Sequence, residues 1–146
     1  MPDPPASAEL PAKTKAQLYS VLPTPDRLDS HPNYTGKGIT IAYLDSGFFP
    51  HPDLVEPSDR ILAFFDVSGS GDFLDRTRKP EFWHWHGAQT SVVAAGNGTL
   101  SGGVYRSLAP DSNLVLVQVG HNGKIRDELI AAGIRWVIEH REQYNI

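Results

Sequence analysis

The stretch from Gly36 to Leu54 reads GKGITIAYLDSGFFPHPDL and decides the expected fold. Its apolar run, residues 39–44, interleaves Ile, Thr and Tyr, which predicts a short buried strand. Asp45 follows the run directly, and Ser46 and Gly47 begin a loop. In an open parallel sheet, chemistry collects at the carboxyl ends of the strands, so Asp45 is a candidate site residue. The alternative is that Asp-Ser-Gly only opens a turn, because Asp and Gly favour turns.

A second stretch places a histidine in front of a run of small residues. His86 and Gly87 precede residues 88–96, which read AQTSVVAAG, and small side chains suit a helix that is buried in the middle of a domain. The β-branched residues of this run give it a mediocre helix propensity, so packing must hold the helix. An Ala-Pro pair, residues 109–110, then leads to residues 114–119, which read LVLVQV. This almost wholly apolar run predicts a parallel strand that is buried on both faces.

These three features, in this order, resemble the subtilisin-like serine peptidases, or subtilases. Residues 41–47 and 51–54 match the family's Asp motif, and residues 86–96 match its His motif. Residues 107–110 match its Gly-Val-Ala-Pro segment more loosely. Each motif is weak alone, but the three in order are specific, and the resemblance covers the chain from about residue 19 onward. It implies an α/β fold, a three-layer sandwich with a parallel sheet, and it implies Asp45 and His86 as catalytic residues.

The sequence departs from the family at the nucleophile. The family needs a serine in a Gly-Thr-Ser-Met-Ala-type motif, and nothing like this motif occurs in the 146 residues. We therefore expect a truncated subtilisin-like fold, in which residues 36–146 form the N-terminal half of a peptidase domain. Residues 1–35 are expected to form a partly disordered arm, because the first of them are rich in proline. Smaller departures are Ala88-Gln89, where the family commonly has Thr-His, and Ser46, where Thr is commoner.

The resemblance implies serine-type endopeptidase activity on a protein or peptide substrate, through an Asp-His-Ser triad. His86 would take the proton of the serine hydroxyl and give it to the leaving amine, while Asp45 would fix the imidazole tautomer. With only two members of the triad, the chain alone is expected to be inactive, and the missing C-terminal half of the domain is an expected partner. Two alternatives stay open, namely a non-catalytic binding or regulatory module that reuses the half-fold, and a metal-binding protein built on His84 and His86.

Composition excludes several classes of protein. The formal charge of −4 and the pI near 5.8 leave no basic surplus for binding nucleic acid. No apolar run reaches the roughly 18 residues of a membrane span. The chain has no cysteine, which excludes disulfides and thiolate metal sites. Residues 1–7 lack the basic region and the apolar core of a secretion signal, so a cytoplasmic location is the default expectation.

Other residues near these motifs have two interpretations each. Asn97, which follows Ala95-Gly96, would be an oxyanion-hole residue or, as we favour, a loop former at the end of the helix. Asp53 matches a position that binds calcium in some subtilases. The other calcium ligands cannot be placed, so we favour a helix-cap or turn role and expect no cofactor. Trp83 and Trp85 are expected to pack or to line a cleft.

The remaining sequence predicts a short helix over residues 16–22, a strand over residues 60–67, a surface loop over residues 73–83 and a helix over residues 126–141. The last of these helices has one apolar face, which comprises Leu129, Ile130, Ile134, Val137 and Ile138. Since half of the domain is expected to be missing, the strand that ends near Val119 should expose an apolar sheet edge. We therefore expect the chain to be poorly soluble or to self-associate.

Overall fold

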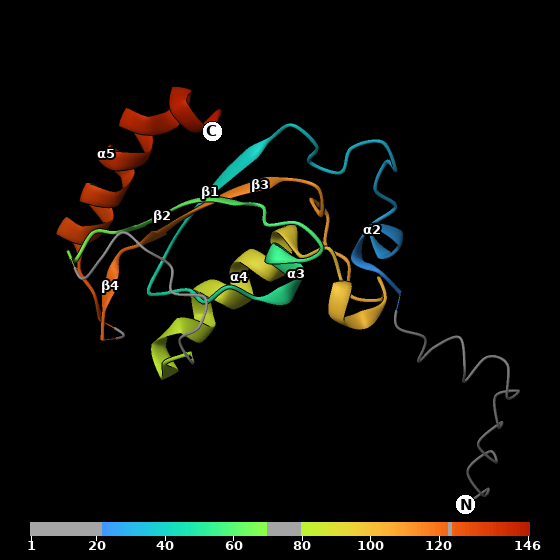
Figure 1. The fold of residues 1–146 in the computed structure, drawn as a ribbon, viewed down its shortest axis with the longest axis horizontal. Coiled ribbons are helices and arrows are strands. Elements are labelled where there is room, and N and C mark those ends of the chain that lie inside the picture. The colour runs from blue at the N-terminus through green and yellow to red at the C-terminus, as the bar shows by residue number, and fades with distance from the viewer. Residues whose placement is uncertain (1–21, 70–79, 123) are drawn as a thin grey trace, which may run out of the picture.

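The computed structural model describes residues 22–69, 80–122 and 124–146. A parallel sheet of three strands lies at its centre (Figure 1). The strands are β1 (Thr40–Asp45), β2 (Ile61–Asp66) and β3 (Asn113–Gln118), and their order in the sheet is β1-β3-β2. The strands predicted over residues 39–44, 60–67 and 114–119 therefore form, with each end shifted by one residue.

Short elements and two longer helices connect and cover the strands. The chain order is α2 (Thr24–Arg27), β1, α3 (Pro52–Val55), β2, η1 (Phe82–His84), α4 (Trp85–Ala95), η2 (Thr99–Ser101), β3, the hairpin strands β4 (Gly120–His121) and β5 (Lys124–Ile125), and α5 (Asp127–Tyr144). Most of the predicted helix over residues 16–22 lies outside the described residues, and Leu22, its last residue, is not helical. Most of the predicted loop over residues 73–83 also lies outside them. Within the described ranges, no helix combines the length and the apolar character needed to cross a membrane.

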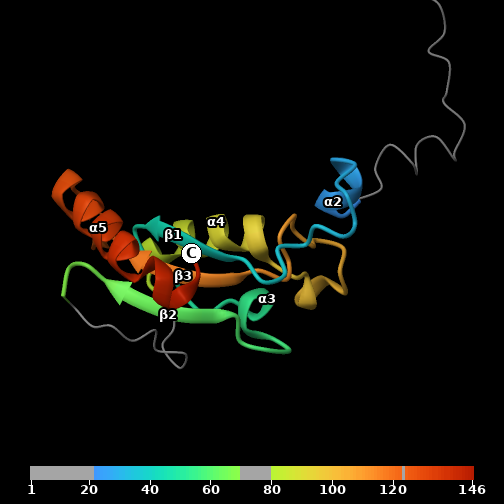
Figure 2. The ribbon, with the colours of Figure 1, turned by 90° about the horizontal axis from the view of Figure 1, so that it is seen from above.

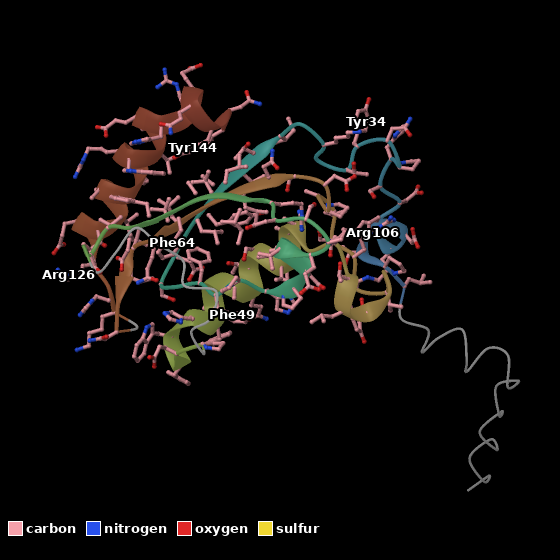
Figure 3. All side chains as sticks on the ribbon, viewed as in Figure 1. Tyr34, Phe49, Phe64, Arg106, Arg126 and Tyr144 are labelled. Carbon is pink, nitrogen blue, oxygen red and sulfur yellow. The ribbon has the colours of Figure 1, made fainter. Side chains whose placement is uncertain are left out.

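Helix α5 lies over one face of the sheet, and α3 and α4 lie against the other, as Figure 1 shows and Figure 2 shows from above. An apolar cluster fills the space on each face. Successive side chains of a strand point to opposite faces, so β3 contributes to both layers. Leu114 and Leu116 pack with residues of α3 and α4, and Val115 and Val117 pack with residues of α5. Figure 3 shows Phe64 on the side of the sheet that α4 covers and Tyr144 on α5, across the sheet. The expected three-layer α/β sandwich with a parallel sheet is confirmed.

The prediction that the strand ending near Val119 forms an exposed edge is wrong. β3 is the central strand, and the four residues from Leu114 to Val117 are each 0% exposed. The crossovers from β1 to β2 and from β2 to β3 place β3 between the two earlier strands, and local sequence does not reveal this order. Within the described part of the chain, β1 and β2 are the edges of the sheet, and the expected solubility defect stays a prediction.

Helix α5 extends beyond its predicted end and turns a different face to the sheet. Leu129, Ile130 and Val137 pack on the sheet as expected, but Ile134 and Ile138 are 47% and 52% exposed. An aromatic residue, Trp136, packs there instead and stacks on Phe65 with ring centroids 4.7 Å apart. The apolar positions alone could not distinguish these two faces, because both have three- and four-residue spacing.

Candidate active site

Asp45 is the last residue of β1, at the carboxyl end of the sheet. Its carboxylate oxygen Oδ1 accepts hydrogen bonds from the backbone N–H of Ser46 at 2.6 Å and from the Ser46 hydroxyl at 3.2 Å. The Asp45 side chain is 11% exposed. A carboxylate that is mostly buried must be hydrogen-bonded, and Ser46 supplies part of that requirement.

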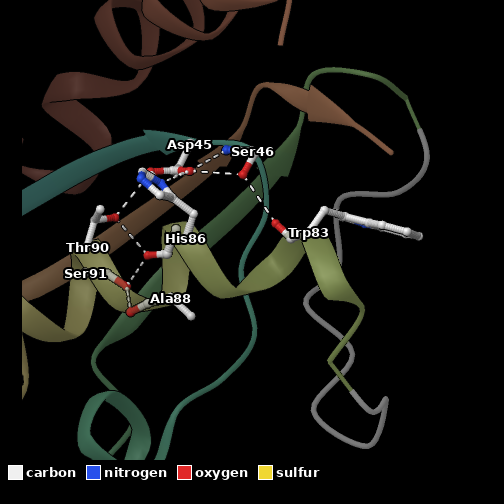
Figure 4. A network of polar contacts seen from close by, with 8 residues as sticks. Asp45, Ser46, Trp83, His86, Ala88, Thr90 and Ser91 are labelled. Carbon is white, nitrogen blue, oxygen red and sulfur yellow. Dashed lines mark hydrogen bonds and ion pairs between the residues drawn. The ribbon is translucent and has the colours of Figure 1, made fainter. Parts of the chain in front are cut away.

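His86 lies in the first turn of α4 and meets Asp45 across 41 positions of sequence. Its ring nitrogen Nδ1 is 2.9 Å from Oδ1 and 2.9 Å from Oδ2 of Asp45 (Figure 4). An ionised carboxylate only accepts hydrogen bonds, so the Nδ1 atom of His86 carries the proton in this pair. In the neutral ring, Nε2 is then left as the proton acceptor. The His86 side chain is 54% exposed, so this acceptor is not sealed inside the domain.

The helix can approach the strand end this closely because Gly87 has no side chain. A Cβ atom at position 87 would overlap the carbonyl oxygen of Gly47 and would lie 2.9 Å from both the Asp45 Cβ and the Phe48 ring. A Cβ atom on Gly47 would in turn lie 2.7 Å from the ring of His84. Gly87 therefore sets the distance between α4 and β1, and through it the contact between Asp45 and His86.

The aromatic residues beside His86 have different environments. Trp85 is 53% exposed, and its ring meets the His86 ring edge to face with centroids 5.3 Å apart. Trp83 contributes its carbonyl oxygen, which accepts a hydrogen bond from the Ser46 hydroxyl at 3.3 Å. Gln89 is exposed, and it lines a shallow apolar pocket with Trp85 on the outer side of α4. Its amide therefore does not require partners in the protein interior.

The structure does not support the metal-binding interpretation of the histidines. His84 lies in η1 and His86 in α4, so the two rings do not alternate along a strand as that interpretation requires. The His84 Nδ1 atom accepts a hydrogen bond from the backbone N–H of Glu81 at 3.0 Å. Within residues 22–69, 80–122 and 124–146, no three or more His, Cys, Asp or Glu side chains are grouped so as to hold a metal ion.

Asp53 and Asn97 both take part in loop structure. Asp53 is 4% exposed, and its Oδ1 atom accepts a hydrogen bond from the backbone N–H of Leu100 at 2.9 Å. The Asn97 amide donates to the Glu56 carbonyl oxygen at 2.6 Å, and its Oδ1 atom accepts from the backbone N–H of Thr99 at 3.0 Å. Asn97 lies beyond the C-terminal end of α4, and about 14 Å of helix separate His86 from that end at Ala95. Asn97 has the loop role that the sequence favoured. Asp53 lies inside α3, whose N-cap is His51, and its side chain instead joins α3 to η2.

Two polar residues that sequence reasoning missed make tertiary contacts. Thr90 places its hydroxyl oxygen 3.3 Å from Asp45 Oδ2, and its position four residues after His86 was the signal that could have identified it. Arg60 is 8% exposed at the opposite end of the sheet. Its guanidinium donates to three backbone carbonyl oxygens, those of Asp53 at 2.6 Å, Ala95 at 2.7 Å and Ser112 at 2.9 Å. Burial lowers the pKa of Arg60, and the nearby carboxylate of Asp111 opposes this effect.

Comparison with known proteins identifies the family. The sequence model of the subtilase family, peptidase S8, matches residues 36–144. The chain belongs to the subtilase family. Serine protease AprX of Bacillus subtilis is 35% identical over 111 residues, which is 74% of this chain and 23% of AprX. The subtilisin-like protease het-Q2 of Podospora anserina is 31% identical over an alignment of 140 positions, which covers 75% of this chain and 37% of that protein.

A solved structure shares the fold. The CspB protease of Clostridium perfringens superposes with a TM-score of 0.65 at 18% sequence identity, over 92% of this chain and 32% of that protein. This subtilase chain thus spans 23% of AprX, 37% of het-Q2 and 32% of CspB. The resemblance inferred from the Asp and His motifs is confirmed at the level of the family and the fold.

Proposed function

We propose that this chain supplies the Asp and His of an Asp-His-Ser triad for serine-type endopeptidase chemistry on protein or peptide substrates. The observation that carries the proposal is the contact of the His86 Nδ1 atom with both carboxylate oxygens of Asp45, each at 2.9 Å. Membership of the subtilase family supports a serine peptidase at the coarser level.

The chemistry follows from the tautomer that Asp45 imposes. With the proton on Nδ1, the Nε2 lone pair of His86 takes the proton of a serine hydroxyl as the hydroxyl oxygen attacks a peptide carbonyl carbon. The imidazolium that forms is stabilised by the carboxylate of Asp45. His86 then gives its Nε2 proton to the leaving amine when the peptide C–N bond breaks.

The nucleophile is the part of the triad that the chain does not provide. The sequence has no Gly-Thr-Ser-type motif, and among the described residues no serine oxygen is hydrogen-bonded to His86. We propose that the serine comes from polypeptide beyond these 146 residues, and that this polypeptide pairs with the open edge of β1. Asp45 ends β1, so a strand added at that edge would deliver its own carboxyl end beside the Asp45–His86 pair.

The test is labelling by a fluorophosphonate probe together with hydrolysis of a fluorescent casein substrate. The chain is assayed alone and in the presence of the C-terminal half of a subtilase domain that carries the Gly-Thr-Ser motif. We expect neither labelling nor hydrolysis alone, and both in the presence of the second half. In the combined sample, replacing Asp45 by Asn should lower kcat by about 10⁴-fold. His31→Ala, which removes an exposed imidazole elsewhere, is the control and should keep full activity.

Two results would contradict the proposal. Labelling of the chain alone would mean that one of its own serines is the nucleophile. If the second half binds, but neither labelling nor hydrolysis appears, the chain would be a non-catalytic binding or regulatory module that reuses the half-fold.

A further inference from the structure

We propose that Thr90 is a positioning residue for the Asp45–His86 pair, an inference that rests on the proposed function of that pair. The Thr90 hydroxyl donates to Oδ2 of Asp45 and fixes the plane of the carboxylate in the orientation that holds His86. Figure 4 shows the hydroxyl and the imidazole projecting from α4 toward the same carboxylate.

The two carboxylate oxygens of Asp45 have different partners. Oδ1 receives the N–H and the hydroxyl of Ser46, at 2.6 Å and 3.2 Å. Apart from His86, Oδ2 receives a hydrogen bond from one described residue, Thr90, at 3.3 Å. The terminal torsion of an aspartate is broad, so donors on one oxygen alone leave the plane of the group poorly defined. A hydrogen-bond donor on each oxygen defines the plane of the Asp45 carboxylate. A carboxylate in this plane keeps both of its oxygens at equal distance from the His86 Nδ1 atom.

The Thr90 hydroxyl has one proton and two acceptors in reach. Besides Asp45 Oδ2, it lies 3.0 Å from the carbonyl oxygen of Gly87. That carbonyl oxygen already accepts the hydroxyl of Ser91 at 2.8 Å, so it does not depend on Thr90. An ionised carboxylate is also a stronger acceptor than a neutral carbonyl. The proton therefore goes to Asp45 while the carboxylate is charged, which is the state in which it must hold the imidazole.

The helix itself provides the alignment. Residues four apart lie on the same face of an α-helix, so His86 and Thr90 both face the end of β1. The β-branched side chain of Thr90 has few rotamers in a helix, so its hydroxyl is held near the carboxylate at little further entropic cost. Thr90 is half-buried, which limits competition from water for Oδ2.

The test measures the Nδ1–H proton of His86 by NMR in the 146-residue chain, so it does not require peptidase activity. A proton held between an imidazole and a carboxylate gives a resolved downfield signal that exchanges slowly with water. We expect Thr90→Val, which keeps the shape and removes the donor, to accelerate this exchange by about 10- to 100-fold, as for a lost hydrogen bond to a charged group. Thr90→Ser, which keeps the hydroxyl, should restore slow exchange. Thr99→Val is the control for the same change away from the site and should leave the signal unchanged.

Asp45→Asn separates the two proposals. If the downfield signal is lost in Asp45→Asn but unchanged in Thr90→Val, the pair is real and the role of Thr90 is wrong. If Asp45→Asn leaves the signal unchanged, the pair does not form in solution, and both proposals are wrong. A Thr90→Val protein that fails to fold would be replaced by Thr90→Ala, for which the same acceleration is expected. Acceleration that Thr90→Ser does not reverse would assign Thr90 a packing role and overturn the inference.

Discussion

The two ends of the sheet both bury polar groups, but they satisfy them differently. At the amino end, the guanidinium of Arg60 donates to three backbone carbonyl oxygens and is almost fully enclosed. At the carboxyl end, Asp45 is enclosed and hydrogen-bonded, whereas its partner His86 is more than half exposed. The His86 ring uses one nitrogen to contact Asp45.

This difference gives the two ends of the sheet different chemical properties. Hydrogen bonds from Arg60 tie α3, the end of α4 and the start of β3 together, and a group whose partners are all backbone atoms has a structural role. A ring with one nitrogen oriented by a carboxylate and the other left as an acceptor has the arrangement that general-base chemistry requires. Burial alone therefore does not identify a functional residue, and neither does an unused hydrogen-bonding atom, because the buried Nε atom of Arg60 also has no partner among the described residues. The unused acceptor of His86 differs in that its side chain is 54% exposed.

The largest effect on stability is expected at the amino end. Arg60→Met keeps much of the side-chain volume but removes the guanidinium donor from three carbonyl oxygens, of which that of Asp53 keeps the backbone N–H of Asn97. We expect the free energy of unfolding to fall by about 4 kcal/mol. Denaturant unfolding followed by circular dichroism measures this change. Arg135→Met removes an exposed arginine and is the control, for which the change should stay within about 0.5 kcal/mol. Equal changes for the two variants would show that the Arg60 contacts do not stabilise the fold.

At the carboxyl end, the most damaging substitution is expected at Gly87. Gly87→Ala adds one methyl group against the Gly47 carbonyl oxygen, which pushes α4 away from β1. We expect the free energy of unfolding to fall by about 3 kcal/mol, which is at the upper end of the range for overpacked cores. We also expect the downfield proton signal of His86 to be lost. Both are measured on the 146-residue chain, by denaturant unfolding and by NMR.

Gln89→Ala is the control for helix propensity, since Gln89 is exposed on the same helix and should tolerate the change. A stable Gly87→Ala protein that retains the downfield signal would mean that the two elements can separate without breaking the Asp45–His86 contact.

The smallest effect is expected at Tyr43, which lies on β1 between the two ends. Burial raises the pKa of Tyr43 to about 12 from its ordinary value of 10.0. Because the pKa is higher in the folded state, the unfolded state ionises first, and stability is lost as the pH rises from about 10 through about 12. Tyr43→Phe removes this loss. The Tyr43 hydroxyl of the unsubstituted protein has no hydrogen-bond partner among the described residues. At neutral pH, Tyr43→Phe should therefore change the free energy of unfolding by no more than about 1 kcal/mol.

Urea unfolding of both proteins at pH 7 and across the alkaline range tests this prediction. Tyr105→Phe, at a position that is 65% exposed, is the control and should follow the pH dependence of the unsubstituted protein. If unsubstituted protein and Tyr43→Phe lost stability in parallel above pH 10, the Tyr43 hydroxyl would not be buried in solution.

The sequence by itself determined the family, the strands and the identity of the candidate pair. The signals were local patterns, which can be recognised in a linear sequence. They were apolar runs of strand length, a carboxylate at the end of one run, and His-Gly before a run of small residues. Asp45 and His86 could be named as candidates from sequence because each lies next to a local pattern, Asp45 at the end of β1 and His86 at the start of α4.

Only the tertiary structure decided the order of the strands, the face of α5 that is buried, and the contacts of Thr90, Gly87 and Arg60. Each of these depends on which elements pack against one another across long separations in sequence. β3 is central because two crossovers place it there, and Trp136 replaces Ile134 and Ile138 in the core because Phe65 lies beneath it. Such contacts depend on distance and direction in space, which the local spacing of residue types does not specify.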